Sequence, residues 1–354
     1  MKKRNVRRDG SPSGQKPPKV QQKKKEQTST SWKKIILLSL TAVAMLGFSV
    51  KILPEIIQQV AFMYRLRLPY FVDLSQPADF SLNHTVNMYV SSEEGISLGV
   101  WLTVPESQWK EAQGKDLNWY QESLGDGNPV FIYFHGNTKN RAAPHRIGVS
   151  KVLSTLGYHV VVPDYRGFGD STGEPTEDGL TTDALYIYNW VKAGSGSSLV
   201  VIWGHSLGTA LVILNKTCDF FLLFPGVVLD GVILEGTFNP AREKIPVNPL
   251  FWFYYSLPGI KYLFIGDGKL FESPVFPNEE NIKKMKSPIL FLHSEDDHLA
   301  RIENVEELRE IGASAQNKDR VKLVKFDGSK GYLHNGLYRD AKLPGVIKDF
   351  VASL

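Results

Sequence analysis

Short, continuous apolar runs alternate with longer amphipathic stretches between residues 130 and 351. Continuous apolar runs are typical of strands that helices cover on both faces of a parallel sheet. The runs predict strands at Val130–Phe134, His159–Pro163, Leu199–Trp203, Val227–Leu234, Ile289–His293 and Val321–Phe326. The stretches between them predict helices near 146–156, at Leu180–Lys192, from Ser206 onward, at Ile302–Gly312 and at Leu343–Val351.

The order of these elements predicts an α/β fold with a doubly wound, mostly parallel sheet over residues 85–354. Ahead of the apolar runs, Thr85–Ser91 and Ile96–Val104 predict a strand pair, and a polar loop is expected at 107–128. An insertion over about 239–286 has the usual position of a small lid. Its aromatic run at 251–255 fits an acyl-chain wall or a membrane-facing surface, and fits core packing equally well.

An uncharged segment from Ile35 to Val50 lies near the N-terminus. As a helix it would be ~24 Å long, short of a ~30 Å hydrocarbon core, but Ile52-Leu53 extends its apolar face. The alternative is a cleavable signal peptide. Against it stand the long polar region in front and the lack of a small-x-small cleavage site before Pro54. We therefore predict one transmembrane signal anchor at residues 32–53.

Charge is distributed unevenly along the chain. Residues 1–34 hold 12 basic and two acidic residues, whereas the rest holds 29 basic and 35 acidic residues, a net charge of −6. We predict that residues 1–31 form a basic disordered tail. The positive-inside rule places this tail in the cytosol and the chain beyond the anchor on the opposite side of the membrane. An acidic body argues against nucleic-acid binding. Residues 54–84 form a juxtamembrane segment that either follows the membrane surface or packs on the domain.

Cys218 is the only cysteine, which excludes an internal disulfide and a cysteine-based zinc site. No motif for a metal or a nucleotide occurs, so we expect no cofactor and no metal.

The motif Gly204-His205-Ser206-Leu207-Gly208 follows one predicted strand directly and opens a helix. In this context the serine stands on a strained turn, and the glycines two residues to either side let strand and helix pass closely. A serine hydroxyl becomes a nucleophile with a histidine and a carboxylate beside it. The motif therefore predicts the α/β-hydrolase fold and a serine hydrolase with Ser206 as nucleophile.

Chain order predicts the partners of this serine, because in α/β-hydrolases the acid and then the histidine follow the nucleophile. Only His334, of eight histidines, lies beyond the last predicted strand, so we assign it as the general base. Three acidic residues at 295–297 follow the strand at 289–293. We prefer Asp297 as the acid, with Asp296 as the runner-up.

Hydrolysis of an ester also requires two N–H groups that face the developing oxyanion. We assign these to Leu207, directly after the nucleophile, and to Asn137 in the loop that follows the strand at 130–134. For His135 and His205 we expect backbone hydrogen bonds to be sufficient.

Longer stretches resemble one family closely. They include Asp164–Gly173, Pro175–Asp183, Phe276–Asn281 and His293–Asp297, together with the motif around Ser206. Over roughly residues 66–354 the chain resembles α/β-hydrolase domain-containing protein 12 and its 12B relative. The resemblance implies a single-pass membrane lipase of the endoplasmic reticulum that acts on lysophosphatidylserine and monoacylglycerols. It puts the family's nucleophile, acid and base on Ser206, Asp297 and His334.

Two other functions are consistent with these residues. One is a thioesterase that removes palmitate from proteins, and the other is a catalytically weak binding protein that keeps only the fold. Two sequons test the predicted lumenal position of the body. Asn83 is expected to be the better glycosylation acceptor, and Asn215, at the end of the helix after the nucleophile, the weaker one.

Overall fold

The computed structural model describes residues 32–41, 45, 72–213, 229–237 and 278–354. The chain divides into two units, residues 1–56 and 57–354. In the first, residues 32–41 are helical, and within the described ranges no helix is both long and apolar enough to cross a membrane. Several predictions fall outside these ranges: the tail, most of the anchor, most of the lid with its aromatic run, and Asn215.

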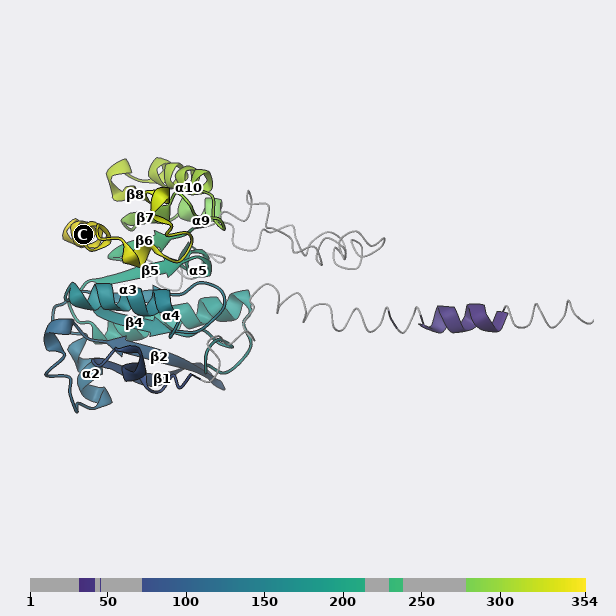
Figure 1. The fold of residues 1–354 in the computed structure, drawn as a ribbon, viewed down its shortest axis with the longest axis horizontal. Coiled ribbons are helices and arrows are strands. Elements are labelled where there is room, and N and C mark those ends of the chain that lie inside the picture. Colours follow the sequence, from purple (N-terminus) through teal and green to yellow (C-terminus); the bar gives the residue numbers. More distant parts are fainter. Residues whose placement is uncertain (1–31, 42–44, 46–71, 214–228, 238–277) are drawn as a thin grey trace, which may run out of the picture. The chain divides into compact units, whose positions relative to one another are not determined.

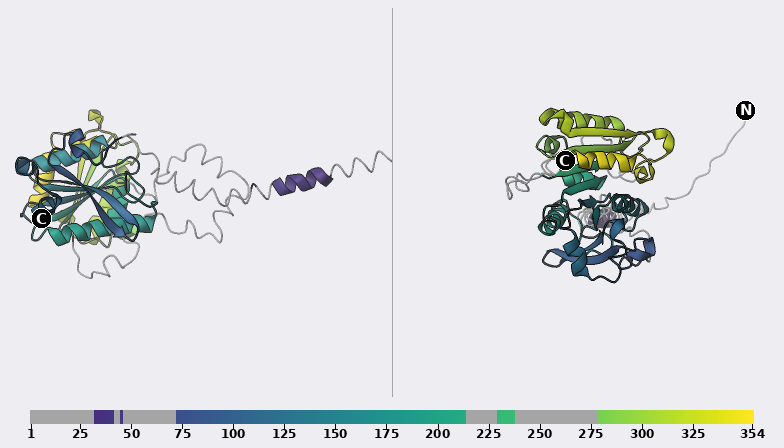
Figure 2. Two further views of the ribbon diagram at one scale, coloured as in Figure 1. Left: turned by 90° about the horizontal axis from the view of Figure 1, so that it is seen from below. Right: turned by 90° about the vertical axis from the view of Figure 1, so that its left-hand side faces the viewer.

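One eight-stranded sheet forms the centre of the second unit (Figure 1). Its order is β1-β2-β4-β3-β5-β6-β7-β8; β2 pairs antiparallel with β1 and β4, and all other neighbours are parallel. The strands fan out with the twist of the sheet (Figure 2). Their bounds are β1 Thr85–Glu93, β2 Ile96–Thr103, β3 Val130–Phe134, β4 His159–Pro163, β5 Val200–His205, β6 Gly231–Glu235, β7 Ile289–Ser294 and β8 Val321–Phe326.

Helices cover both faces of this sheet. On one face α4 (Glu177–Gly194), α5 (Leu207–Ile213) and α10 (Ile302–Ala315) pack into one core cluster. On the other face α3 (Pro144–Thr155) and α11 (Leu343–Ala352) pack into a second cluster. Every residue of β3 to β7 is buried, which explains why these strands are continuous apolar runs.

The predicted α/β fold of residues 85–354 is confirmed, since each strand and helix predicted within it corresponds to an element within a few residues of the expected bounds. The polar loop predicted over 107–128 is wrong in part, because α2 (Leu117–Ser123) lies within it. Asp116 caps this helix by accepting a hydrogen bond from the backbone N–H of Trp119 at 3.0 Å, and Tyr120 is buried beneath it. The remaining short elements are α9 Asn278–Ile282 and the 3₁₀ turns Pro77–Phe80, Glu106–Gln108, Lys318–Arg320, Gly328–Lys330 and Leu337–Arg339.

The folded domain begins before the boundary predicted at residue 85. Leu74 and Leu82 are buried in the second core cluster, and Trp101 Nε1 donates a hydrogen bond to Leu74 O at 2.8 Å. The described part of the predicted juxtamembrane segment, residues 72–84, therefore packs on the domain.

Candidate active site

The nucleophile elbow joins β5 to α5. Ser206 has a φ of 52°, a left-handed conformation that is strained for a serine and held by its surroundings. A side chain at Gly204 would meet Gly208 O at 2.6 Å, and one at Gly208 would meet Phe134 O at 2.0 Å. Strand and helix can pass this closely only with glycine at both positions, as the motif predicted.

His334 and Asp297 meet at the carboxyl ends of β8 and β7. His334 Nδ1 lies 2.7 Å from Asp297 Oδ2, and Asp297 Oδ1 accepts hydrogen bonds from the backbone N–H groups of Leu299 and Ala300 at 2.9 and 3.0 Å. Burial would raise the pKa of Asp297, but these hydrogen bonds lower it overall, so the carboxylate is ionised. An ionised partner at Nδ1 fixes that nitrogen as the donor and leaves Nε2 as the basic nitrogen.

Asp296 has a different environment from its neighbour. Its Oδ1 accepts hydrogen bonds from Ser294 Oγ at 2.5 Å and from the backbone N–H of Leu333 at 3.1 Å. Leu333 has a φ of 52°, so this contact holds a strained residue directly before His334. The structure therefore joins Asp297 to the histidine side chain and joins Asp296 to the backbone of the histidine loop.

The elbow and the histidine loop are in contact. His205 Nε2 lies 3.0 Å from His334 O, and the two rings are 5.0 Å apart between centroids. Burial lowers the pKa of His205 to about 3, so its ring is neutral and donates through Nε2. A side chain at Gly236, after β6, would come within 2.9 Å of His334 Cε1, so only glycine fits there. His334 Nε2 is itself buried and has no hydrogen-bond partner among the described residues.

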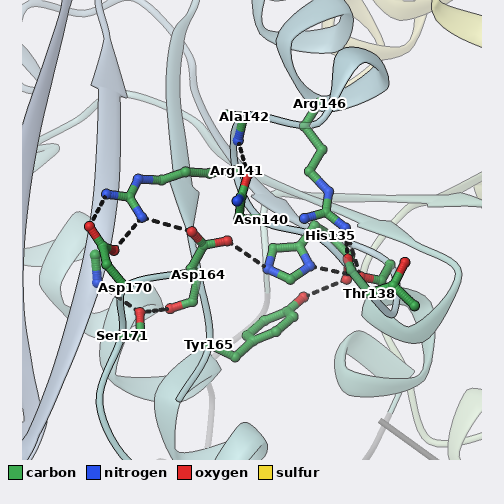
Figure 3. A network of polar contacts seen from close by, with 12 residues as sticks. His135, Thr138, Asn140, Arg141, Ala142, Arg146, Asp164, Tyr165, Asp170 and Ser171 are labelled. Carbon is green, nitrogen blue, oxygen red and sulfur yellow. Dashed lines mark hydrogen bonds and ion pairs between the residues drawn. The ribbon is translucent and has the colours of Figure 1, made fainter. Parts of the chain in front are cut away.

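The loop after β3 lies against the elbow, since a side chain at Gly136 would meet Ser206 Cβ at 3.1 Å. Side chains hold several of its carbonyl groups (Figure 3). Arg146 Nη2 donates to Gly136 O at 3.0 Å and to Thr138 O at 2.5 Å, and Tyr165 Oη donates to His135 O at 2.9 Å. These contacts fix the course of the loop that carries Asn137.

His135 has more than the backbone contact that we expected for it. Its Nδ1 lies 2.7 Å from Gly136 O, and its Nε2 lies 3.2 Å from Asp164 Oδ1 (Figure 3). Arg141 Nη1 joins Asp164 to Asp170, at 2.7 and 2.6 Å. His135, Asp164, Arg141 and Arg146 are all buried, so this polar network is enclosed beneath the loop. No local sequence pattern predicts this network, because its partners lie far apart in the chain.

A buried carboxyl group also lies next to the elbow. Glu235 ends β6, accepts a hydrogen bond from Trp203 Nε1 at 2.9 Å, and its backbone O accepts one from Ser206 N at 3.0 Å. Burial raises the pKa of Glu235 to about 8, so the side chain keeps its proton near neutrality. The only sequence signal for it was a charged residue at the end of an apolar run.

This carboxyl group should make the stability of the protein depend on pH. Between about pH 5 and 8 the folded protein keeps the proton of Glu235 while the unfolded chain releases it, so the free energy of unfolding should fall as pH rises. By pH 8 the free energy of unfolding should have fallen by as much as about 4 kcal/mol from its value below about pH 4.5. Glu235→Gln, whose amide oxygen can still accept from Trp203, should remove this fall. Denaturant unfolding at several pH values gives the pH dependence of the free energy of unfolding for the wild type and for Glu235→Gln. An equal dependence in the two proteins would contradict this prediction.

Within the described ranges, no group of three or more histidine, cysteine, aspartate or glutamate side chains is arranged to hold a metal ion.

Known proteins resemble the chain over most of its length. The profile of the alpha/beta hydrolase fold family matches residues 129–214. Lysophosphatidylserine lipase ABHD12 of Danio rerio is 40% identical over 85% of this chain and 78% of its own length, and that of Xenopus tropicalis is 42% identical over 86% and 79%. Protein ABHD12B of Homo sapiens is 41% identical over 84% and 80%.

Solved structures share the fold at much lower identity. The esterase Pf2001 of Pyrococcus furiosus is 18% identical with a TM-score of 0.55, covering 81% of this chain and 97% of its own. Est1E of Butyrivibrio proteoclasticus with bound ferulic acid is 18% identical with a TM-score of 0.53, covering 75% and 98%.

Proposed function

Because this chain is a serine ester hydrolase that belongs to the ABHD12 family of α/β-hydrolases, we propose that it cleaves the single acyl ester of a lysophospholipid such as lysophosphatidylserine, or of a monoacylglycerol. The observation that carries the proposal is the named activity of relatives about 40% identical over most of both chains. The contact between His334 and Asp297 beside the elbow supports it.

In this proposal Ser206 attacks the ester carbonyl, and His334 Nε2 takes the hydroxyl proton while Asp297 orients the ring. The backbone N–H groups of Leu207 and Asn137 stabilise the oxyanion. His334 then protonates the departing glycerol oxygen, and water hydrolyses the acyl-enzyme with His334 again as base.

Two exposed leucines support a lipid substrate. Leu299 is 50% exposed and Leu333 is 47% exposed, and they lie two residues after Asp297 and directly before His334. Apolar side chains at the rim of a site suit an acyl chain or a lipid surface.

Arg146 sets the direction of the second oxyanion donor in this mechanism. In a planar trans peptide the N–H points away from the C=O, so the groups that hold Gly136 O also direct the N–H of Asn137. Arg146 and His135 hold that oxygen at 3.0 and 2.7 Å. We propose that they are positioning residues for the donor.

Arg146→Met should therefore lower kcat by about 100-fold, similar to the loss of one oxyanion donor, with a much smaller change in KM. Arg146→Lys, which keeps a donor, should recover part of kcat. Steady-state kinetics on a soluble ester measures the two constants, and thermal unfolding checks that the variants are folded. A higher KM with unchanged kcat would contradict the assignment.

The panel of substrates that tests the function uses one acyl chain throughout. Purified full-length protein in detergent is given lysophosphatidylserine, a monoacylglycerol and a palmitoylated cysteine thioester, and kcat/KM is compared. We expect both oxygen esters to be cleaved faster than the thioester. Cleavage of the thioester alone would replace this proposal with a depalmitoylating thioesterase.

We also propose a membrane location. Residues 32–53 would anchor the protein in the endoplasmic reticulum, with the basic tail in the cytosol and the catalytic domain in the lumen. The uncharged segment and the excess of basic residues before it support this orientation.

Glycosylation provides a test of that orientation. Asn83 is exposed in a turn directly before β1, so a glycan has room there. Protein expressed in mammalian cells should migrate faster after endoglycosidase treatment, and Asn83→Gln should remove most of that shift. Asn215→Gln is the matched comparison and should change it little. A catalytic domain that is digested by protease in sealed microsomes would overturn the proposed topology.

A further inference from the structure

A cationic groove lies beside the candidate active site. It has a volume of about 300 Å³. Basic and neutral polar side chains dominate its lining, which contains no aspartate or glutamate. Its residues are Lys139, Pro144, His145, His298, Tyr332, Leu333, Asn335, Gly336, Tyr338 and Arg339.

The groove is built from the same three loops that carry the catalytic groups. Lys139 lies two residues after Asn137, His298 directly follows Asp297, and Leu333 and Asn335 stand on either side of His334. The base must reach the departing glycerol oxygen, so the leaving group of the ester lies on the side of His334. The groove is therefore where the part of the substrate beyond the ester oxygen would lie.

Neither permanent cation of the groove, Lys139 or Arg339, forms a direct ion pair within the described part of the chain, and Asp340, next to Tyr332 of the lining, offsets their charge only in part. Arg339 instead donates to Gly336 O and Gly331 O at 3.3 and 3.1 Å. These two cations stand on a body whose net charge is −6 beyond residue 34. A local excess of cations on an acidic surface favours an anionic ligand.

The backbone that carries Lys139 and the guanidinium of Arg339 are each held in a defined arrangement. Thr138 and Lys139 have φ values of 67° and 61°, and Arg146 secures this strained turn at Thr138 O. The Arg339 guanidinium also lies 5.7 Å from the centre of the Tyr332 ring. Groups that are already ordered lose less entropy when a ligand binds.

His145 adds a neutral hydrogen-bonding group to the lining. Its Nε2 is buried without a partner among the described residues, and burial lowers the pKa of His145 well below its usual value. It can therefore form a hydrogen bond with a polar group of the ligand. Because its ring is uncharged, it does not repel a positively charged ligand group such as an amine.

We propose that this groove binds the phosphodiester head group of a lysophospholipid substrate, with Lys139 and Arg339 as its phosphate ligands. The proposal rests on the proposed lipase function, because the ligand is the leaving group of that reaction. It makes the groove a determinant of specificity for an anionic over a neutral glycerol ester.

The kinetic test compares two substrates that differ only in the head group. Lysophosphatidylserine and a monoacylglycerol with the same acyl chain are presented in the same neutral detergent. We expect Lys139→Gln to lower the ratio of their kcat/KM values at least about tenfold, because it removes a charged hydrogen bond to the phosphate. Lys139→Gln combined with Arg339→Gln should lower the ratio further. Lys139→Arg should keep most of the ratio.

Lys348→Gln is the matched control. It removes an exposed lysine of α11 that does not line the groove, so it should leave the ratio unchanged. If Lys139→Gln lowered both substrates equally, the residue would act on the fold of the loop and the proposal would be wrong. A ratio that stayed constant in both groove variants would overturn it as well.

Binding without turnover separates this proposal from the proposed function. Calorimetry should show that the wild type binds glycerophosphoserine, the deacylated head group, and that Lys139→Gln raises the dissociation constant at least about tenfold. Inorganic phosphate should bind the wild type more weakly than glycerophosphoserine does. If the wild type cleaved neither lipid yet bound glycerophosphoserine through Lys139, the lipase function would fail and the groove would stand. Absence of binding to the wild type would overturn the groove.

Discussion

Replacement of Ser206 by alanine is expected to lower kcat for ester hydrolysis by about 10⁵-fold or more, because no acyl-enzyme can then form. The residual rate would come from the oxyanion donors and substrate binding alone. The fold should persist, since alanine has the same backbone cost as serine at a φ of 52° and removes no hydrogen bond that the described structure assigns to Oγ.

Three measurements on the full-length protein check this result: kcat on a short-chain ester, labelling by a fluorophosphonate, and the thermal midpoint. Ser314→Ala is the matched control, because Ser314 is exposed on α10 and its hydroxyl contacts only Glu310 O. Turnover or labelling of Ser206→Ala at the wild-type level would assign the nucleophile to another residue.

The fold was predictable because its signals are local. Each central strand is an apolar run whose burial on both faces leaves no position for a polar residue, and the elbow needs two glycines for a close approach that a side chain would block. The helix α2 was missed because its stability depends on one cap at Asp116 and one buried ring at Tyr120. A polar segment with so few apolar positions resembles a loop.

The polar interior of the site was not predictable in the same way. Arg146 and Glu235 are buried because distant segments supply their partners, Gly136 O and Trp203 Nε1. Burial of a charged group is decided by tertiary contacts, and a sequence pattern that counts charges as surface positions places such residues wrongly. Lys139 and Arg339 are exposed, but they are 200 residues apart in the chain, and only the tertiary structure shows that they line one groove.

Chain order also could not separate the adjacent carboxylates at 296 and 297. Both follow β7, and both have hydrogen bonds to the segment around His334. Only the geometry distinguishes a contact with the imidazole ring from a contact with the backbone before it.

Asp297→Asn is therefore expected to lower kcat by about 10⁴-fold, whereas Asp296→Asn should lower it by less than about tenfold. In Asp297→Asn the amide oxygen would keep the hydrogen bonds from the backbone N–H groups of Leu299 and Ala300, which turns the NH₂ group toward His334 Nδ1. The histidine would then adopt the tautomer with its proton on Nε2, and it could no longer accept the proton of the nucleophile.

In Asp296→Asn the amide oxygen can still accept from Ser294 Oγ and from the Leu333 N–H, so the histidine loop keeps its course. The two variants change charge and volume equally, which makes each the control for the other. Steady-state kcat and the rate of fluorophosphonate labelling report the two effects, and both should fall together in Asp297→Asn because the tautomer affects every reaction of the serine. Equal losses in the two variants, or a larger loss at Asp296, would transfer the role of the acid to Asp296 and leave the nucleophile and the base as assigned.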